Sequence, residues 1–344
     1  MVKSGHMKKL RIAINGFGRI GRAFVRQAYD RPELEVVAVN DLGSLESLAY
    51  LLKYDTVYKR APFEVAVKEG ALMINGKEVK VLSEKEPSAL PWKDLAIDVV
   101  VESTGFFTDY DKAKAHIDAG ARRVVISAPG KGEEGSAGAT ILMGLDESKF
   151  GVCPVTSNAS CTTNASSPVI AIMDESIGIE RAILSTTHGY TASQALVDGP
   201  SKKDLREGRA AAQNIVPSST GAAIAVTKAY PALSGKFDGI SLRVPVPAGS
   251  IADITFVAKR DTSAEEVNEI LKKAASEKRW SGIFAVTDEP LVSSDILGNE
   301  HASIADLAMT RVVDKTLVKV LAWYDNEAGY THTLIEHAIK TGQS

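Results

Sequence analysis

The chain has 344 residues, of which 44% are hydrophobic and 24% are charged, so it can bury a substantial core. Its 40 Lys and Arg residues against 43 Asp and Glu residues leave a net charge of -3, which argues against a nucleic-acid-binding protein that acts through bulk positive charge. Its two cysteines, Cys153 and Cys161, cannot form a disulfide framework, so we expect a reducing, cytoplasmic compartment.

No apolar run approaches the ~20 residues of a membrane span, so we expect no membrane partner. Residues 1–7 contain no apolar signal core and are left out of the fold prediction.

The first 160 residues alternate strand and helix patterns. Strands are predicted over residues 10–15, 34–40, 98–102 and 124–127, and helices over residues 20–28, 44–54 and 109–119. This alternation is typical of right-handed βαβ units around a parallel sheet. The first half is therefore predicted to be a Rossmann-type α/β domain.

The second half has longer β runs and fewer helices. Strands are predicted over residues 182–187, 239–246, 251–259 and 317–324, with helices from Thr262 and over residues 331–340. Ser263 and Glu266 offer a capping box for the first of these helices. The pattern predicts an α+β domain with a mostly antiparallel sheet. We therefore predict a dinucleotide-binding domain over residues 1–160, completed by a C-terminal helix over 326–344, and a catalytic domain over 161–325.

A G-x-G-x-x-G motif follows the first predicted strand, with its glycines at Gly16, Gly18 and Gly21. The first glycine permits a tight turn, the second lets the backbone approach a pyrophosphate, and the third lets the helix pack closely. Asp41 ends the second strand, where its carboxylate would accept hydrogen bonds from a ribose 2′-hydroxyl and repel a 2′-phosphate. The motif predicts binding of NAD rather than NADP.

Cys161 lies where a loop becomes a helix, and His188 ends the predicted strand over 182–187. A thiol in the first helical turn lies at the positive end of the helix dipole, which is expected to lower its pKa. From position alone, Cys161 is either a nucleophile or a buried packing residue, and His188 is either its base or a surface group. Cys153 precedes Pro154 in an apolar stretch and is interpreted as structural.

Six motifs stand out along the chain: Asn-Gly-Phe-Gly-Arg-Ile-Gly-Arg at 15–22, Ser-Cys-Thr-Thr-Asn at 160–164, His-Gly-Tyr-Thr at 188–191, Pro-Ser-Ser-Thr-Gly-Ala-Ala at 217–223, Leu-Arg-Val-Pro at 242–245 and Asp-Asn-Glu at 325–327. Together they resemble one family, phosphorylating, NAD-dependent glyceraldehyde-3-phosphate dehydrogenase of the glycolytic type. The resemblance extends over nearly the whole chain.

The resemblance implies a role for each matching residue. Cys161 would be the nucleophile and His188 the base. Cofactor contacts would come from the three glycines and from Arg19, Ile20, Asp41, Lys85, Ser127 and Asn326. Substrate and phosphate contacts would come from Ser160, Thr162, Thr191, Arg209, Thr220, Gly221 and Arg243. The substrates would be glyceraldehyde 3-phosphate and inorganic phosphate, no metal would be needed, and residues 191–213 would contribute to a homotetramer interface.

The sequence departs from the family pattern at three positions. Ala165 replaces a second cysteine, Ile224 replaces a lysine, and Ala328 replaces a tryptophan near the nicotinamide side. Three alternatives remain at this point: an erythrose-4-phosphate dehydrogenase, an NADP-preferring enzyme, and a non-catalytic nucleotide- or RNA-binding module.

Overall fold

The computed structural model describes residues 9–201 and 204–344. The N-terminal residues left out of the fold prediction lie outside this description, as do residues 202 and 203 of the expected interface segment. The chain divides into two compact units. Unit 1 contains residues 9–141, 148–158 and 334–344, and unit 2 contains residues 142–147 and 159–333.

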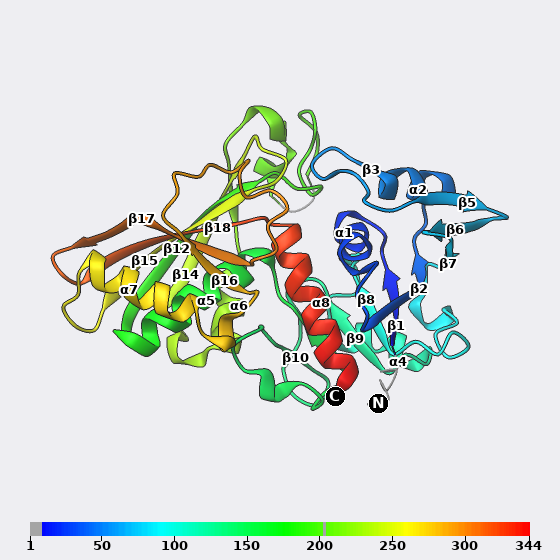
Figure 1. Cartoon of the computed structure of the whole chain (residues 1–344), viewed down its shortest axis with the longest axis horizontal. Helices are drawn as coiled ribbons and strands as arrows, with labels where there is room; N and C mark the ends of the chain where they lie inside the picture. Colours follow the sequence, from blue (N-terminus) through cyan, green and yellow to red (C-terminus); the bar gives the residue numbers. More distant parts are fainter. Residues whose placement is uncertain (1–8, 202–203) are drawn as a thin grey trace, which may run out of the picture. The chain divides into compact units, whose positions relative to one another are not determined.

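Unit 1 is built on a nine-stranded sheet with the order β10-β11-β9-β8-β1-β2-β7-β6-β5. Neighbours from β10 to β7 run parallel, and β7, β6 and β5 run antiparallel (Figure 1). Its strands are β1 (Leu10–Asn15), β2 (Leu34–Asn40), β5 (Val65–Lys68), β6 (Ala71–Ile74), β7 (Lys77–Leu82), β8 (Val99–Glu102), β9 (Arg123–Ile126), β10 (Gly138–Thr140) and β11 (Val155–Ser157), with a separate ribbon of β3 (Tyr54–Asp55) and β4 (Lys59–Arg60). The helices are α1 (Arg19–Ala28), α2 (Leu45–Lys53), α3 (Tyr110–Ala113), α4 (Ala115–Asp118) and the 3-10 turn η1 (Pro87–Ala89).

The central strand β8 is buried because both faces of the sheet are covered. Val99, Val100 and Val101 of β8 are all 0% exposed. The predicted Rossmann-type parallel sheet is confirmed. The prediction was wrong in one detail: residues 109–119 form two short helices, α3 and α4, that meet at Lys114. The hairpins of β5, β6 and β7 were not predicted.

Unit 2 contains a seven-stranded sheet with the order β13-β14-β12-β15-β18-β17-β16. The β14–β12 and β17–β16 pairs are parallel and the other four are antiparallel, so the predicted mostly antiparallel sheet is confirmed. The strands are β12 (Ile179–Gly189), β13 (Val216–Ser219), β14 (Phe237–Val244), β15 (Ser250–Ala258), β16 (Phe284–Thr287), β17 (Ser303–Val313) and β18 (Leu317–Tyr324). The helices are α5 (Cys161–Ser176), α6 (Ala222–Ala229), α7 (Ala264–Ala275) and the 3-10 turns η3 (Leu205–Gly208), η4 (Ala211–Gln213), η5 (Pro231–Leu233) and η6 (Lys278–Trp280). The turn η2 (Glu147–Lys149) and helix α8 (Ala328–Gln343) have residues in both units.

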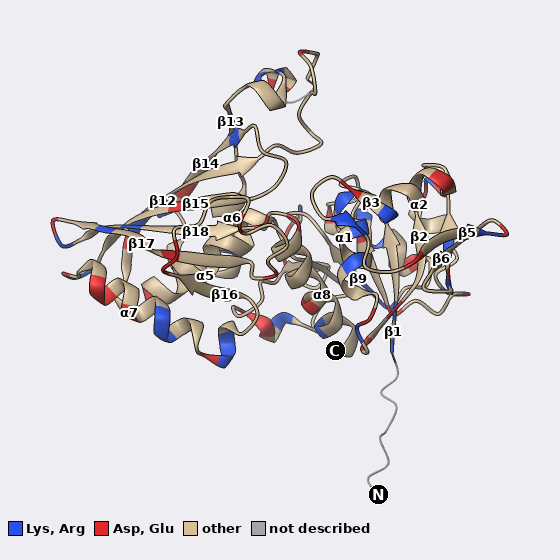
Figure 2. Cartoon of the chain, turned by 45° about the horizontal axis from the view of Figure 1, so that its top comes forward, with Lys and Arg blue, Asp and Glu red and all other residues tan. Residues whose placement is uncertain are grey.

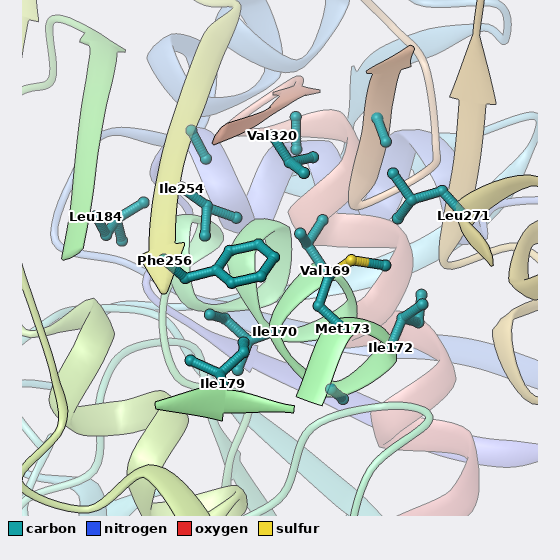
Figure 3. Packing of buried hydrophobic residues seen from close by; sticks show 14 of the residues in the cluster. Val169, Ile170, Ile172, Met173, Ile179, Leu184, Ile254, Phe256, Leu271 and Val320 are labelled. Atoms are coloured by element: carbon teal, nitrogen blue, oxygen red, sulfur yellow. The ribbon is translucent and has the colours of Figure 1, made fainter. Parts of the chain in front are cut away.

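The core of unit 2 lies between α5 and the sheet. Val169, Ile170 and Met173 of α5 are 0% exposed, and Figure 3 shows them beside Ile254 and Phe256 of β15. Each such side chain contributes about 1.5–3 kcal/mol through burial, as an upper estimate. This packing holds α5, and therefore its first residue, in a fixed place on the sheet.

Helix α7 shows half of the predicted capping box. The Ser263 side chain accepts a hydrogen bond from the Glu266 N–H at 3.2 Å. The Glu266 carboxylate accepts instead from the Thr262 hydroxyl at 2.8 Å and from Arg260 at 2.7 Å. Figure 2 shows acidic residues at the start of α7 and basic residues at its end, the arrangement that the helix dipole favours.

Candidate active site

Cys161 is the first residue of α5, and the preceding turn presents its thiol at the helix N-terminus. The Ser160 side chain caps the helix by accepting a hydrogen bond from the Thr163 N–H at 3.1 Å. Ala159 has a φ of 54°, a left-handed conformation that costs a non-glycine residue about 1–2 kcal/mol. This bend places Cys161 at the N-terminus of α5, where it is partly exposed. Cys153, by contrast, is buried.

His188 reaches this thiol from the end of strand β12. Its Nε2 atom lies 3.3 Å from the Cys161 Sγ atom. Strand β12 pairs in parallel with β14, in a register that puts Arg243 directly beside His188. The fold of unit 2 therefore gathers the thiol, the imidazole and one predicted phosphate-binding arginine at one place.

Tyr324 belongs to this site, although the sequence analysis did not assign it a role. Its ring lies edge-on to His188 with 5.9 Å between the ring centroids. Its hydroxyl contacts Thr162 Oγ1 at 3.0 Å and Thr186 Oγ1 at 2.7 Å, so it connects α5 with β12. Burial raises the pKa of Tyr324, so the phenol stays neutral. The one signal in the sequence is its place directly before Asp325-Asn326-Glu327.

The other ring nitrogen of His188 has two competing partners. His188 Nδ1 lies 2.6 Å from the Gly189 carbonyl oxygen and 2.6 Å from Arg243 Nη1. If Nδ1 carries the proton, it donates to the carbonyl and leaves Nε2 free to accept the thiol proton. If Nδ1 instead accepts from Arg243, Nε2 carries the proton and donates toward the sulfur. These two arrangements are those of a general base and a general acid.

Cys161 and His188 are both neutral, as the directions of their pKa shifts indicate. Burial, with a further contribution from the Arg243 cation, lowers the pKa of His188 to about 3. Burial also raises the pKa of the Cys161 thiol, while Arg243 acts in the opposite direction. The expectation of a lowered thiol pKa is therefore corrected, because desolvation of the sulfur outweighs the favourable charges around it.

The two predicted phosphate-binding arginines lie in different surroundings. Arg243 is half-buried beside His188, and its Nε atom is buried without a hydrogen-bond partner. The Arg209 side chain is 62% exposed and pairs with Asp198 at 3.0 Å. Arg243 is the more buried of the two because it lies in the strand β14, whereas Arg209 lies in a surface loop.

Of the hydroxyl groups predicted to contact substrate or phosphate, some are buried in contacts within the fold and others lie at the surface. Thr162 is buried against Tyr324, which leaves its backbone N–H in the first turn of α5 as the group able to meet an anion. Thr191 Oγ1 lies 3.1 Å from Ser193 Oγ on the surface. Thr220 Oγ1 accepts from the Ala222 N–H at 3.1 Å, and the neighbouring Gly221 is exposed. Thr220 and Gly221 follow the far end of β13: Val216, which begins that strand, pairs with Arg243, whereas Ser219, which ends it, pairs with Ile240.

In unit 1, the three glycines of the motif meet the steric requirements of a nucleotide-binding loop. Gly16 has a φ of +93°, and a Cβ atom there would lie 2.6 Å from Thr104 N. A Cβ at Gly21 would lie 2.3 Å from the Gly16 carbonyl oxygen, so only glycine allows this close packing. A Cβ at Gly18 would meet no atom within 4 Å, which leaves room for a ligand to approach the backbone. This cradle fits a dinucleotide.

Asp41 lies at the end of β2 with its carboxylate directed to the same loop. Its Oδ2 atom accepts from the Phe17 N–H at 2.8 Å, and its Oδ1 atom accepts from the Gly43 N–H at 2.9 Å. Arg19 makes a two-pronged ion pair with Asp55, at 2.8 and 3.3 Å. These contacts hold Asp41 and Arg19, two of the predicted cofactor-binding residues, in place around the glycine loop.

The remaining predicted cofactor residues are placed as follows. In unit 1, Ile20 and Ser127 are half-buried, and Lys85 is exposed. Asn326 belongs to unit 2, and its Oδ1 atom accepts from the Gly249 N–H at 3.1 Å and from the Ser250 hydroxyl at 3.0 Å. These two bonds orient the amide and leave its Nδ2 group for another partner.

The described residues contain neither a metal-binding cluster nor a helix able to cross a membrane. Across residues 9–201 and 204–344, no group of three or more His, Cys, Asp or Glu side chains is arranged to hold a metal ion. None of the helices in that part of the chain has the length and apolar character needed to cross a membrane.

A dinucleotide-binding sheet and a histidine-paired thiol define a class of protein, the cofactor-dependent oxidoreductases that act through a cysteine. Residues 10–110 match the family model described as the glyceraldehyde 3-phosphate dehydrogenase NAD binding domain, and residues 160–326 match its C-terminal domain. The chain belongs to the glyceraldehyde-3-phosphate dehydrogenase family. The resemblance seen in the motifs and the predicted cofactor, NAD, are thereby confirmed.

Full-length relatives agree with the family models. A glyceraldehyde-3-phosphate dehydrogenase of Mycobacterium avium is 47% identical over 343 residues, covering 97% of this chain and 99% of that protein. The enzyme of that name from Clostridium acetobutylicum is 48% identical, covering 94% of this chain and 96% of that protein. Glyceraldehyde-3-phosphate dehydrogenase 2 of Bacillus subtilis is 46% identical, covering 95% of each chain.

Proposed function

We propose that the chain catalyses the oxidative phosphorylation of D-glyceraldehyde 3-phosphate to 1,3-bisphosphoglycerate with NAD and inorganic phosphate, in glycolysis and gluconeogenesis. The observation that carries this proposal is the 3.3 Å contact between Cys161 Sγ and His188 Nε2 at the N-terminus of α5. We further propose that unit 1 is the dinucleotide-binding domain and unit 2 the catalytic domain.

The first step uses both members of the pair. His188 Nε2 takes the thiol proton while Nδ1–H donates to the Gly189 carbonyl, and Cys161 Sγ bonds to the aldehyde carbon to form a hemithioacetal. The Cys161 backbone N–H and His188 stabilise the oxyanion that develops. Protonated His188 returns its proton to this oxygen, which completes the hemithioacetal hydroxyl, and takes that proton up again as the carbon is oxidised. NAD supplies the acceptor for the hydride.

The second step releases the product. Oxidation leaves a thioester on Cys161, which inorganic phosphate attacks. The carbon–sulfur bond breaks, and Cys161 leaves as the thiolate. Protonated His188, whose Nε2 atom faces the sulfur at 3.3 Å, stabilises this leaving group, and the charge of Arg243, on the other side of the ring, also favours the thiolate.

The reaction needs positions for two anions, the substrate's own phosphate group and the attacking phosphate. We propose that Arg243 and Arg209 serve them together with Ser160, the Thr162 backbone, Thr191 and the Thr220-Gly221 turn. A guanidinium group suits this task because it makes paired hydrogen bonds to phosphate oxygens.

We also propose a homotetramer in the cytoplasm. The described part of the 191–213 segment exposes large apolar side chains, with Leu196 82%, Val197 72% and Leu205 84% exposed, and Ile215, two residues after the segment, is 68% exposed. Such a group of exposed apolar side chains is typical of an interface. Both cysteines are free thiols, which suits a reducing compartment.

The test follows NADH formation at 340 nm. We expect turnover with glyceraldehyde 3-phosphate that depends on both NAD and inorganic phosphate, and that is lost in C161S. A higher kcat/KM with erythrose 4-phosphate than with glyceraldehyde 3-phosphate would overturn the assigned substrate. Turnover that persists in C161S would overturn the mechanism.

A further inference from the structure

A buried carboxylate lies beneath the glycine loop of unit 1. Glu102 ends strand β8 and is 1% exposed. Its Oε2 atom accepts from Asn15 Nδ2 at 2.6 Å. Its Oε1 atom accepts from the Thr104 N–H at 2.8 Å and from the Thr104 hydroxyl. Donors on both oxygens are what a carboxylate needs to remain in the interior.

The fourth contact to Glu102 comes from His116, which is 0% exposed. His116 Nε2 lies 3.1 Å from Glu102 Oε2, and His116 Nδ1 lies 3.0 Å from Trp92 Nε1. An indole N–H can only donate, so Nδ1 is the acceptor and Nε2 carries the proton. All four contacts therefore donate to the Glu102 side chain.

The groups held by Glu102 are those that shape the glycine loop. Asn15 and Thr104 belong to the two backbone segments that enclose Gly16, where a Cβ atom would lie 2.6 Å from Thr104 N. The Ser103 hydroxyl donates to the Gly16 carbonyl oxygen at 2.6 Å. Asn15 Oδ1 also accepts from Asn40 Nδ2 at 2.7 Å, and Asn40 is the residue before Asp41. One carboxylate thus connects the loop with the strand that delivers Asp41.

We propose that Glu102 and His116 are positioning residues for the dinucleotide, because they fix the Gly16 loop and Asp41 relative to each other before the ligand arrives. This inference rests on the proposed function only in that the ligand is NAD. Neither side chain needs to touch the cofactor. The network acts by removing alternative loop conformations, so its loss weakens NAD binding and leaves the chemistry at Cys161 intact.

The test is the isosteric variant Glu102→Gln. The new side chain has one oxygen and one NH₂ group in place of two oxygens. In either orientation, the NH₂ group faces two hydrogen-bond donors and can accept from neither. We expect the Kd and the KM for NAD to rise about 10-fold, with kcat at saturating NAD within about twofold of wild type. Titration calorimetry gives the Kd, and initial rates with glyceraldehyde 3-phosphate give the KM and kcat.

The matched control is Asp98→Asn. Asp98 directly precedes β8 at the opposite end of the strand from Glu102, is 4% exposed, and accepts from the Arg11 N–H at 3.0 Å and from Arg122 Nη1 at 2.7 Å. This variant also loses a buried carboxylate in the same sheet, but it should keep the wild-type Kd for NAD. Thr104→Val, which removes one hydroxyl donor, serves if Glu102→Gln does not fold, with an expected rise in Kd of about threefold.

A wild-type Kd in folded Glu102→Gln or, failing that, in Thr104→Val would overturn the proposal. So would an equal weakening in Asp98→Asn, because the effect would then reflect stability alone. The direct measurement of NAD binding keeps this test separate from the proposed reaction. Wild-type protein that binds NAD but does not oxidise glyceraldehyde 3-phosphate would refute the function and still decide the role of Glu102.

Discussion

Cys161 Sγ lies 3.3 Å from His188 Nε2, and the opposite nitrogen of the same ring lies 2.6 Å from Arg243 Nη1. The imidazole therefore lies between the Cys161 thiol, which must lose its proton to act as a nucleophile, and the Arg243 cation, whose charge opposes protonation of the imidazole. Burial is the main cause of both pKa shifts: it lowers the pKa of His188, an effect to which Arg243 adds, and it raises the pKa of Cys161 against the opposing effect of Arg243.

The first prediction concerns the reactivity of the two cysteines. Substoichiometric iodoacetamide should label Cys161 before Cys153, because Cys161 is partly exposed and has a base beside it while Cys153 is 1% exposed. Peptide mapping after partial inactivation measures this order. The variant C153S should be inactivated at the wild-type rate. Equal labelling of both sites with full activity retained would refute the assignment of Cys161.

The second prediction concerns the charge of Arg243. Arg243→Leu removes the cation that acts to lower the Cys161 pKa, so the pH profile of alkylation should move to higher pH. Arg209→Leu is the control, because Arg209 is exposed and pairs with Asp198, and it should leave the profile unchanged.

The third prediction concerns the two phosphate positions. We expect Arg243→Leu to lose more activity than Arg209→Leu, because Arg243 also contacts His188. Both variants should raise the KM for phosphate or for the aldehyde while the Kd for NAD stays at the wild-type value. Initial rates at varied phosphate and varied aldehyde measure both constants. Wild-type constants in both variants would mean that the two arginines are structural.

The fourth prediction concerns stability in acid. The pKa values of His188 and His337 are both lowered to about 3 by burial. Unfolded histidines titrate near 6.5, so below that pH the unfolded chain binds more protons and is favoured. Stability is complete above pH ~6.5 and should fall toward pH ~3 by up to ~1.4 kcal/mol per pH unit for each histidine.

Urea unfolding between pH 7 and pH 4.5 at fixed protein concentration measures this slope. The variant His337→Asn should be less stable than the wild type at every pH. Its free energy of unfolding should depend less steeply on pH, by the slope that about one proton contributes. An unchanged slope in this variant would show that His337 is not one of the groups that take up protons on unfolding.

The fifth prediction concerns cofactor choice. A 2′-phosphate beside the Asp41 carboxylate would add like-charge repulsion, so kcat/KM for NAD should exceed that for NADP by on the order of 100-fold. Asp41→Ala should narrow this ratio, mainly by weakening NAD. Comparable values for the two cofactors in the wild-type protein would contradict the selectivity assigned to Asp41.

The sequence by itself determined the features that depend on neighbours along the chain. The spacing of Gly16, Gly18 and Gly21 between a strand and a helix predicts the nucleotide loop, because the steric demands of that turn are local. The position of Cys161 where a loop becomes a helix was also predicted from local sequence, and the structure adds that the Ser160 side chain caps this helix. The strand over 317–324 was predicted at its observed bounds from its β-rich run.

Only the tertiary structure decided the relations between distant residues. The parallel register of β12 and β14 places Arg243 beside His188, and no local pattern specifies which strands pair. Tyr324 joins the site through hydroxyl contacts with two other elements, and Glu102 meets His116 through the fold of the sheet. The pKa of Cys161 was misjudged for the same reason. A helix terminus is visible in sequence, whereas the burial that raises the thiol pKa depends on everything packed around it.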